Sequence, residues 1–237
     1  MRNQWQTKNK RLSKNSNMQV KEKFPGVFVS GKSIYTKNNS PGYAVYGEEL
    51  IKDGGIEYRS WTPFRSKLSA AIAKGLKTSP FKEDSIVLYL GAANGTTSSH
   101  VRDICHKGAV YCVEFSEESM RDLLKVAEKK SMVGILSDAR RPANYQFLVP
   151  PVDIVYQDVA QPDQTGILLD NCKMFLKPRG YAVIAIKARS IDTNADPQSI
   201  FNDVRKELEE SFEIIEEIGL GSFEKDHELL VCRARRG

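Results

Sequence analysis

The alternation of hydrophobic and polar positions divides the chain into three stretches. Residues 1–20 are polar and basic, without an acidic side chain, and are predicted to form a disordered tail. Residues 21–60 alternate short apolar runs with turn signals, which is typical of a small antiparallel β domain. From residue 61 to residue 237, long apolar runs alternate with amphipathic stretches, and this pattern predicts one larger α/β domain.

Three apolar runs supply the strands expected in the small N-terminal β unit. These runs are residues 27–29, 43–46 and 56–58, and the turn signals around them are Gly31-Lys32, Asn38-Asn39, Pro41-Gly42 and Gly54-Gly55.

The sequence of the larger domain predicts strands separated by helices. The expected helices cover about residues 62–76, with Thr62 as the cap, then from the end of the glycine loop at Thr97 to about residue 106, and about residues 164–175 and 196–211. A further helix is expected after Ser116, its cap, with Glu117 and Glu118 in its first turn. The expected strands are 85–90, 109–114, 133–136, 152–156 and 181–186, followed by β runs at 212–218 and 228–233. Near-continuous apolar strands joined by helices predict a doubly wound, mainly parallel seven-stranded sheet that is covered on both faces.

Charge adds a weak indication of nucleic acid. The net charge is +5, and the basic residues gather at the two ends of the sequence. They are Arg2, Lys8, Lys10, Arg11, Lys14 and Lys21 at one end, and Arg233, Arg235 and Arg236 at the other. Such tails either contact phosphate groups or simply keep the chain in solution.

Several classes of protein are disfavoured by the composition. No apolar run approaches the roughly 20 residues that span a bilayer, so no membrane partner is expected. The four cysteines lack C-x-x-C spacing and are expected to be reduced core thiols. The three histidines form no cluster with them, so no metal is expected.

The first strand of the larger domain ends in a glycine loop, Gly91 to Gly95. Ligands of such sheets bind beyond the carboxyl ends of the strands, and glycine permits a ligand to approach the backbone closely. The loop does not match the dinucleotide-binding pattern G-x-G-x-x-G, because position 93 is alanine. It also does not match a phosphate-binding loop, because no lysine follows the second glycine. A nucleoside ligand such as S-adenosylmethionine is favoured, and we expect it to approach the backbone at Gly91, although such loops are often only structural.

Charged residues end the next four strands. Glu114 could accept hydrogen bonds from ribose hydroxyls, and Asp138 could meet an adenine amino group. Asp158 and Lys187 end neighbouring strands and could pair beside a cofactor. Taken singly, each of these residues is more often a solvated strand end. From the pattern alone, Lys67 is interpreted as a solvated helix residue. His227 is interpreted as a loop histidine without a function.

The chain resembles the fibrillarin family, in its archaeal form, over about nine-tenths of its length. The segments that carry the resemblance are TKNN (36–39), PG (41–42), VYGE (45–48), YRSWTP (58–63), SKL (66–68), LYLGAANGTT (88–97), VEFS (113–116), DAR (138–140), DVAQPDQ (158–164), IKA (186–188) and DH (226–227). The resemblance implies a Rossmann-like class I methyltransferase fold. It also implies S-adenosylmethionine-dependent methylation of RNA ribose 2′-hydroxyls, in rRNA and in tRNA.

The resemblance further implies the functional residues. The implied catalytic set is Lys67, Asp158, Lys187 and His227. The expected cofactor-binding residues are Gly91, Ala92, Gly95, Thr96, Thr97, Glu114, Phe115, Asp138, Ala139, Asp158 and Gln161. A 2′-hydroxyl is a poor nucleophile until its proton is drawn away, whereas a methyl sulfonium is already a strong electrophile. Lys187 therefore acts either as the general base or by stabilising the alkoxide, and the sequence leaves both roles open.

The implied partners are those of a box C/D ribonucleoprotein: a guide RNA and its target RNA, a coiled-coil Nop-type scaffold protein and a kink-turn-binding ribosomal-type protein. Eukaryotic members carry a Gly/Arg-rich tract, whereas this chain has a short basic tail. That difference favours a cytoplasmic protein of an archaeal cell. The alternative function is a non-catalytic, structural RNA-binding subunit, which would have no need of all four catalytic residues.

Overall fold

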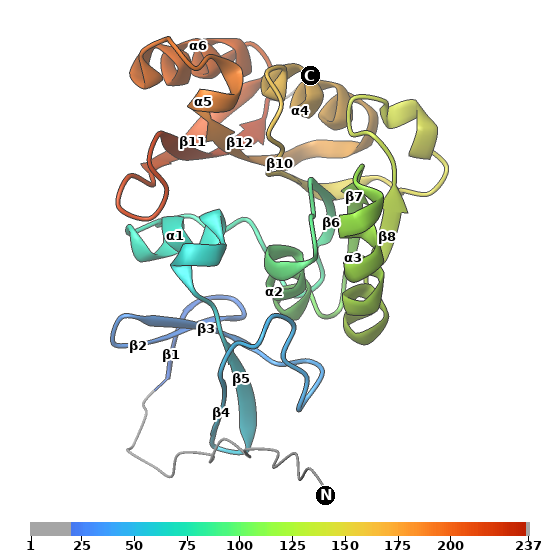
Figure 1. The fold of residues 1–237 in the computed structure, drawn as a ribbon, viewed down its shortest axis with the longest axis vertical. Helices are drawn as coiled ribbons and strands as arrows, with labels where there is room; N and C mark the ends of the chain where they lie inside the picture. The colour runs from blue at the N-terminus through green and yellow to red at the C-terminus, as the bar shows by residue number, and fades with distance from the viewer. Residues whose placement is uncertain (1–19, 236–237) are drawn as a thin grey trace, which may run out of the picture.

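The computed structural model describes residues 20–235. A seven-stranded sheet occupies the larger part of the molecule, and a five-stranded antiparallel sheet lies at its N-terminal end (Figure 1). The predicted disorder of the tail concerns residues 1–19, which lie outside the described residues.

The larger sheet has the strand order β11-β12-β10-β9-β6-β7-β8. Neighbouring strands from β10 to β8 are parallel, whereas β12 runs antiparallel to both β10 and β11. The predicted doubly wound, mainly parallel sheet is thereby confirmed, with its chain order reversing between β6 and β9. Its strands are β6 (Ile86–Leu90), β7 (Ala109–Glu114), β8 (Val133–Leu136), β9 (Val152–Gln157), β10 (Leu176–Lys187), β11 (Phe212–Gly219) and β12 (His227–Ala234).

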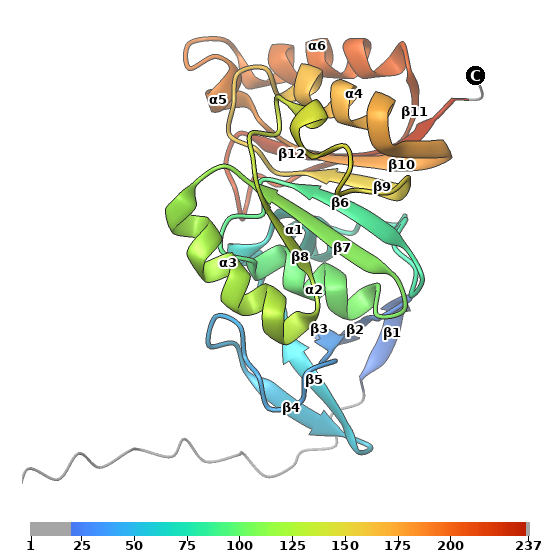
Figure 2. The same cartoon turned by 90° about the vertical axis from the view of Figure 1, so that its right-hand side faces the viewer.

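Helices cover both faces of this sheet (Figure 2). Val87 and Tyr89 of β6 belong to the core beneath α1, α2 and α3, whereas Leu88 and Leu90 belong to the core beneath α4 and α6. Successive side chains of a strand point to opposite faces, so a strand covered on both sides must be apolar throughout. The helices are α1 (Lys67–Ala73), α2 (Thr96–Ile104), α3 (Glu117–Lys130), α4 (Gln164–Phe175), α5 (Ala188–Ile191) and α6 (Pro197–Glu209), with 3₁₀ turns η1 (Pro63–Arg65) and η2 (Pro142–Tyr145).

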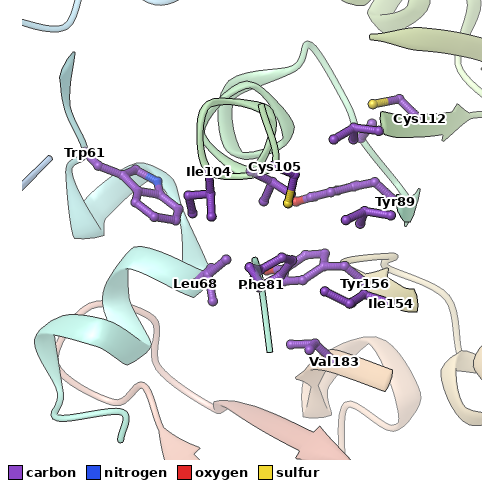
Figure 3. Close-up of a cluster of buried hydrophobic side chains, with 14 of the residues drawn as sticks. Trp61, Leu68, Phe81, Tyr89, Ile104, Cys105, Cys112, Ile154, Tyr156 and Val183 are labelled. Atoms are coloured by element: carbon purple, nitrogen blue, oxygen red, sulfur yellow. The ribbon is translucent and has the colours of Figure 1, made fainter. Parts of the chain in front are cut away.

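An aromatic stack fills the core behind the end of β9 (Figure 3). The rings of Tyr89 and Tyr156 lie 4.5 Å apart at an interplanar angle of 29°, and Phe81 packs beside Tyr156. Burial, and then the neighbouring charge of Asp158, raises the pKa of Tyr156 well above its usual value. Burial likewise raises the pKa of Tyr89 well above its usual value, so both phenols stay neutral.

The small sheet has five strands in the order β1-β2-β3-β5-β4, where the sequence predicted three. The expected strand at 43–46 is wrong. The backbone N–H groups of Val45 and Tyr46 donate to the carboxylate of Glu48 at 3.0 and 2.8 Å, so this segment turns instead of pairing with a neighbouring strand. The strands are β1 (Lys21–Phe24), β2 (Val27–Ser30), β3 (Ser33–Lys37), β4 (Leu50–Asp53) and β5 (Ile56–Ser60).

Two further boundaries differ from the prediction. The helix expected from residue 62 is broken at Ser66, whose backbone is extended and whose hydroxyl caps α1 by accepting from Ser69 N–H at 3.3 Å. Thr62 caps only the short turn η1. The fifth strand begins at Leu176 instead of residue 181, because the chain continues through an irregularity in its pairing with β9.

A buried ionic network joins the small sheet to α2 and α3. Arg59 of β5 pairs with Glu48 and with Asp103 of α2, both at 3.2 Å, and Lys130 of α3 pairs with Asp103 at 3.0 Å. The four side chains are at most 2% exposed. The charges of two cations and two anions balance within the network. Removal of any one side chain would therefore leave an uncompensated buried charge. The two sheets are therefore held together by interactions that water does not screen.

His100 of α2 lies next to this network. Its ring nitrogens contact the Thr36 hydroxyl at 2.7 Å and the Tyr46 hydroxyl at 2.9 Å, and its ring stacks on Trp61 at 4.8 Å. Burial, reinforced by the nearby cations Arg59 and Lys130, lowers the pKa of His100 well below its usual value. The imidazole is therefore neutral in the folded protein.

All four cysteines are free and buried. Burial raises the pKa of Cys105, Cys112 and Cys232 to about 12, so these thiols stay protonated and unreactive at neutral pH. The expectation of reduced core thiols is confirmed. Within residues 20–235, no helix has the length and apolar character needed to cross a membrane.

Candidate active site

A cavity of about 240 Å³ opens at the carboxyl edge of the large sheet, where β6, β7, β8, β9 and β10 end. This is the position at which doubly wound sheets bind their ligands. The cavity is lined by Gly91, Ala93, Val113, Glu114, Phe115, Ser137, Asp138, Ala139, Asp158, Val159, Ala160, Gln161, Ile167 and Lys187.

Asp158 lies between two lysines at the edge of this cavity. Its carboxylate pairs with the ammonium of Lys187 at 2.9 Å and with the ammonium of Lys67 at 3.3 Å. Lys187 also donates to the main-chain oxygen of Asp158 at 3.2 Å. All three side chains are 15% exposed, so solvent reaches the group but does not surround it. We refer to Lys67, Asp158 and Lys187 as the charged triad.

The members of the charged triad come from three separate elements. Asp158 follows β9, and its N–H donates to Leu90 of β6 at 2.9 Å, which fixes its main chain at the sheet edge. Lys187 is the final residue of β10, the neighbouring strand. Lys67 is the first residue of α1, and it reaches Asp158 across 91 positions of sequence. Lys67, which looked like a solvated helix residue, is therefore a member of the site.

His227 begins β12 directly opposite Lys187 in the strand register. Its Nδ1 lies 2.6 Å from the main-chain oxygen of Lys225. A carbonyl can only accept a hydrogen bond, so Nδ1 carries a proton and the Nε2 of the neutral ring is left as an acceptor. The structure thus brings the His227 backbone next to the charged triad, while the ring is turned to its own loop and does not complete a hydrogen-bonded ring with Asp158.

Glu114 and its neighbours form the opposite end of the cavity. Both carboxylate oxygens of Glu114 are held by backbone N–H groups, from Ala93 at 2.8 Å and from Ser116 at 2.9 Å. Asp138 pairs with Arg140 at 2.9 Å, and this hydrogen bond lowers the pKa of Asp138. Phe115 is 67% exposed at the cavity rim, which leaves its ring available to a planar ligand. These side chains combine fixed anionic acceptors with an apolar wall.

The glycine loop differs in detail from the expectation. Gly91 lines the cavity, but Ala92, Gly95, Thr96 and Thr97 do not, and Ala93 lies there instead. A Cβ atom on Gly95 would lie 3.1 Å from Leu123 of α3, so this glycine is needed where α2 packs on α3. A Cβ atom on Gly91 would lie 2.8 Å from the main-chain oxygen of Asp158. The absent side chain at position 91 therefore makes room for the main chain that follows β9, and Gly91 also lines the cavity.

Gln164 is a residue of this site whose role the sequence did not predict. Its fully buried amide accepts from Lys187 N–H at 3.1 Å and donates to Lys187 C=O at 3.2 Å. Its own main-chain oxygen accepts from Gln157 at 2.7 Å. The side chain thus holds the backbone of Lys187 at the point where β10 leaves the sheet. The sequence signals were a glutamine at the start of an expected helix and its place at the end of the segment DVAQPDQ (158–164), which carries part of the family resemblance.

The charged triad has a net charge of one positive unit and lies beside a cavity with polar and apolar walls. Such an arrangement stabilises negative charge that develops on an oxygen atom, because the cations are fixed before the reaction begins. Within residues 20–235, no group of three or more potential metal ligands is present.

Comparisons with known proteins agree with this geometry. A protein-family model described as Fibrillarin matches residues 18–236. The chain is 51% identical to the fibrillarin-like rRNA/tRNA 2′-O-methyltransferase of Thermococcus onnurineus over 220 residues, which cover 90% of this chain and 97% of that protein.

Solved structures agree as well. The Methanococcus jannaschii fibrillarin pre-rRNA processing protein has a TM-score of 0.89 and 45% identity, covering 94% of this chain and all of that one. Aeropyrum pernix fibrillarin with natively bound S-adenosyl-L-methionine has a TM-score of 0.83 and 42% identity, covering 90% and 97%. A fibrillarin/Nop5p complex has a TM-score of 0.82 and 40% identity, covering 89% and 98%.

Proposed function

This chain belongs to the fibrillarin family, and from that premise we propose that it transfers the methyl group of S-adenosylmethionine to ribose 2′-hydroxyls of RNA. The substrate class is rRNA, together with tRNA as the name of the Thermococcus relative indicates. The observation that carries the proposal is the charged triad beside the cavity, because it places two fixed cations and one carboxylate where a hydroxyl must lose its proton.

The lining of the cavity fits S-adenosylmethionine. Glu114 presents a fixed carboxylate for ribose hydroxyls, Asp138 an acceptor for an amino group, and Phe115 an exposed ring for a purine. When bound, the cofactor supplies a methyl group on a positively charged sulfur, which is a strong electrophile. The protein therefore needs to hold the reacting oxygen in line and to draw off its proton.

The charged triad meets this need. Lys187 contacts the 2′-oxygen and favours its alkoxide character, and Asp158 orients Lys187 through the 2.9 Å ion pair. Lys67 holds the adjacent phosphate or ribose while it also contacts Asp158. His227 offers Nε2 as an acceptor beside Lys187, and the ring must turn to join the group.

The partners follow from the same family. The fibrillarin of the Nop5p complex is 40% identical to this chain, so a Nop-type coiled-coil protein is the partner of this chain also. We further propose a guide RNA and a kink-turn-binding protein, in a particle that acts in the archaeal cytoplasm. The modest net charge of +5 suits an enzyme that borrows its RNA affinity from partners.

Methyl transfer to RNA tests the proposal. Radiolabelled S-adenosylmethionine is supplied to the chain alone, and to the chain with guide RNA and both partner proteins. Transfer to one 2′-hydroxyl of the guided target, with little or none by the isolated chain, is the expected result. Normal assembly without any transfer would instead favour a structural subunit, and full activity of the isolated chain on unguided RNA would remove the need for the partners.

A further inference from the structure

Two aromatic rings lie at the catalytic edge without lining the cavity. Phe64 of η1 is 71% exposed, and its ring meets Phe223 edge-to-face with centroids 5.3 Å apart. Phe223 belongs to the loop between β11 and β12, where it is half-buried against the core and supports the exposed ring of Phe64. Burying a phenylalanine stabilises a protein, so a ring left open to solvent is available to a ligand. We call Phe64 and Phe223 the aromatic pair.

The topology of the sheet fixes where the aromatic pair lies. β12 runs antiparallel to β10, so the loop before His227 lies at the same edge as Lys187. Phe64 precedes Lys67 by three residues, and the ammonium of Lys67 reaches Asp158. Figure 1 shows this loop beside α1, the helix that follows η1. The aromatic pair therefore lies at the same edge of the sheet as the charged triad, on the side of Lys67 and His227.

An exposed cation lies within two residues of each ring in the sequence. Arg65 is exposed and stands over the ring of Tyr46 at 5.4 Å, and Lys225 is exposed in the same loop as Phe223. Of the acids in that loop, Asp226 is already paired with Arg189 at 3.0 Å, and Glu224 is half-buried. Exposed aromatic rings beside cations are the usual means by which proteins hold an RNA strand, through stacking on bases and attraction of phosphates.

We infer that the aromatic pair, with Arg65 and Lys225, binds the RNA strand whose 2′-hydroxyl reaches Lys187, and that Phe64 stacks on a nucleobase next to the reacting ribose. The inference rests on the proposed function. A protein partner fits this surface less well, because two rings between cations offer little continuous apolar area. A protein partner is better accommodated at the β8 edge of the large sheet, where three aliphatic side chains are exposed: Leu124, Val133 and Leu136.

The test uses the complete particle with guide RNA and both partner proteins. Phe64→Ala, Phe64→Leu and Phe64→Trp are compared in single-turnover methylation at increasing concentrations of target RNA. We expect Phe64→Ala to raise the RNA concentration for half-maximal rate by about tenfold or more, as expected for a lost base–aromatic stack. Phe64→Trp should restore it and Phe64→Leu should not, while S-adenosylmethionine affinity stays unchanged in all three.

Phe147→Ala is the matched control, because Phe147 is 94% exposed and lies in the segment before β9, away from the carboxyl edge. Phe147→Ala should leave the target RNA concentration for half-maximal rate unchanged. Equal saturation by wild type and Phe64→Ala would overturn the inference, and so would full rescue by leucine. Loss of binding to the scaffold protein would assign the surface to a protein partner. The absence of transfer by wild type would instead remove the proposed function itself.

Discussion

Gly91 and Asp158 lie so close that no side chain fits between them: a Cβ atom on Gly91 would stand 2.8 Å from the main-chain oxygen of Asp158. The glycine also has a φ of +76°, which side chains disfavour. The loop after β6 and the main chain of Asp158, directly after β9, are thus packed against one another at the point where the chain order of the sheet reverses.

Gly91→Ala should therefore act through Asp158. We expect methyl transfer to fall by roughly tenfold or more, since a displacement of about 1 Å can cost about 10²-fold in rate. Single-turnover methylation in the particle measures the effect. Gly55→Ala is the control, because Gly55 has a φ of +81° and open space around it. If the two variants lose the same activity, backbone strain and not contact with Asp158 is responsible.

Removal of Lys187 should separate chemistry from binding. Lys187→Ala is expected to fold, to enter the particle and to bind S-adenosylmethionine, but to lose about 10²–10⁴-fold in methyl transfer, as is typical for a missing proton-transfer or orienting group. Asp158→Ala should lose transfer and also some cofactor affinity, because we place the Asp158 carboxylate beside the methyl donor and the Lys187 ammonium on the RNA side of the methyl group. Calorimetry and single-turnover rates distinguish the two variants.

Lys177→Ala is the matched control for Lys187→Ala. Lys177 is on the same strand and pairs with Asp153 at 2.7 Å, yet it lies outside the cavity lining. Its replacement should leave methyl transfer unchanged. Wild-type rates in Lys187→Ala would show that the catalytic assignment is wrong.

Replacement of Gln164 should release the backbone of Lys187. Gln164→Met keeps the volume but removes both amide hydrogen bonds, so we expect methyl transfer to fall while S-adenosylmethionine still binds. Gln164→Glu keeps the acceptor and regains a donor only when the carboxyl is protonated, which burial favours. Its rate relative to wild type should rise as the pH is lowered.

An ionised carboxylate buried at position 164 also destabilises the fold, and acid relieves this effect too. Urea unfolding of Gln164→Glu at the same pH values therefore separates positioning of Lys187 from general loss of structure. Gln198→Met on the exposed face of α6 is the control. A flat profile, or wild-type rates in Gln164→Met, would show that the amide does not position Lys187.

Protonation of His100 should govern stability on the acid side of neutrality. The pKa of His100 is lowered by burial and by Arg59 and Lys130, so the unfolded chain binds a proton at a pH where the folded chain does not. The contribution of neutral His100 to the free energy of unfolding is complete above pH 6.5, the usual pKa of histidine. This contribution is lost as the pH falls below that value. The expected slope is about 1.4 kcal/mol per pH unit for one proton.

Urea unfolding at successive pH values measures this slope. His100→Asn should reduce it between about pH 6.5 and about pH 5.5, before carboxylates titrate. His106→Gln should not, because the His106 side chain is 42% exposed. A slope that is unchanged in His100→Asn would show that other groups cause the acid sensitivity.

The charged strand ends could be predicted because parallel strands bring their carboxyl ends to one edge. Asp158 and Lys187 end apolar runs, and for this reason their proximity followed from the sequence alone. The five parallel strands, separated by helices, were readable for the same reason, since a doubly covered strand is apolar throughout. The catalytic and cofactor roles given to these residues stay predictions.

Contacts made by single side chains across the fold could not be predicted from the hydrophobic pattern, and only the family resemblance assigned Lys67 and His227 to the site. Glu48 captures two backbone N–H groups of the segment expected to be a strand, and nothing in the local apolar pattern reveals this. Gln164 reaches Lys187 across 23 positions, and Lys67 reaches Asp158 across 91. The orientation of the His227 ring depends on a carbonyl two residues away, which hydrophobic periodicity does not encode.

The strand order has a consequence for synthesis of the chain on the ribosome. β12 lies inside the sheet, between β10 and β11, although it is translated after both. Until β12 has emerged, β11 has no place to pair and the β10 edge, which bears Lys187, stays open to unwanted strand pairing. A nascent chain can therefore form β6 to β10 early, but the sheet is completed only when β12, which begins at His227, is inserted. Ribosome pausing between β11 and β12 would expose this edge to aggregation.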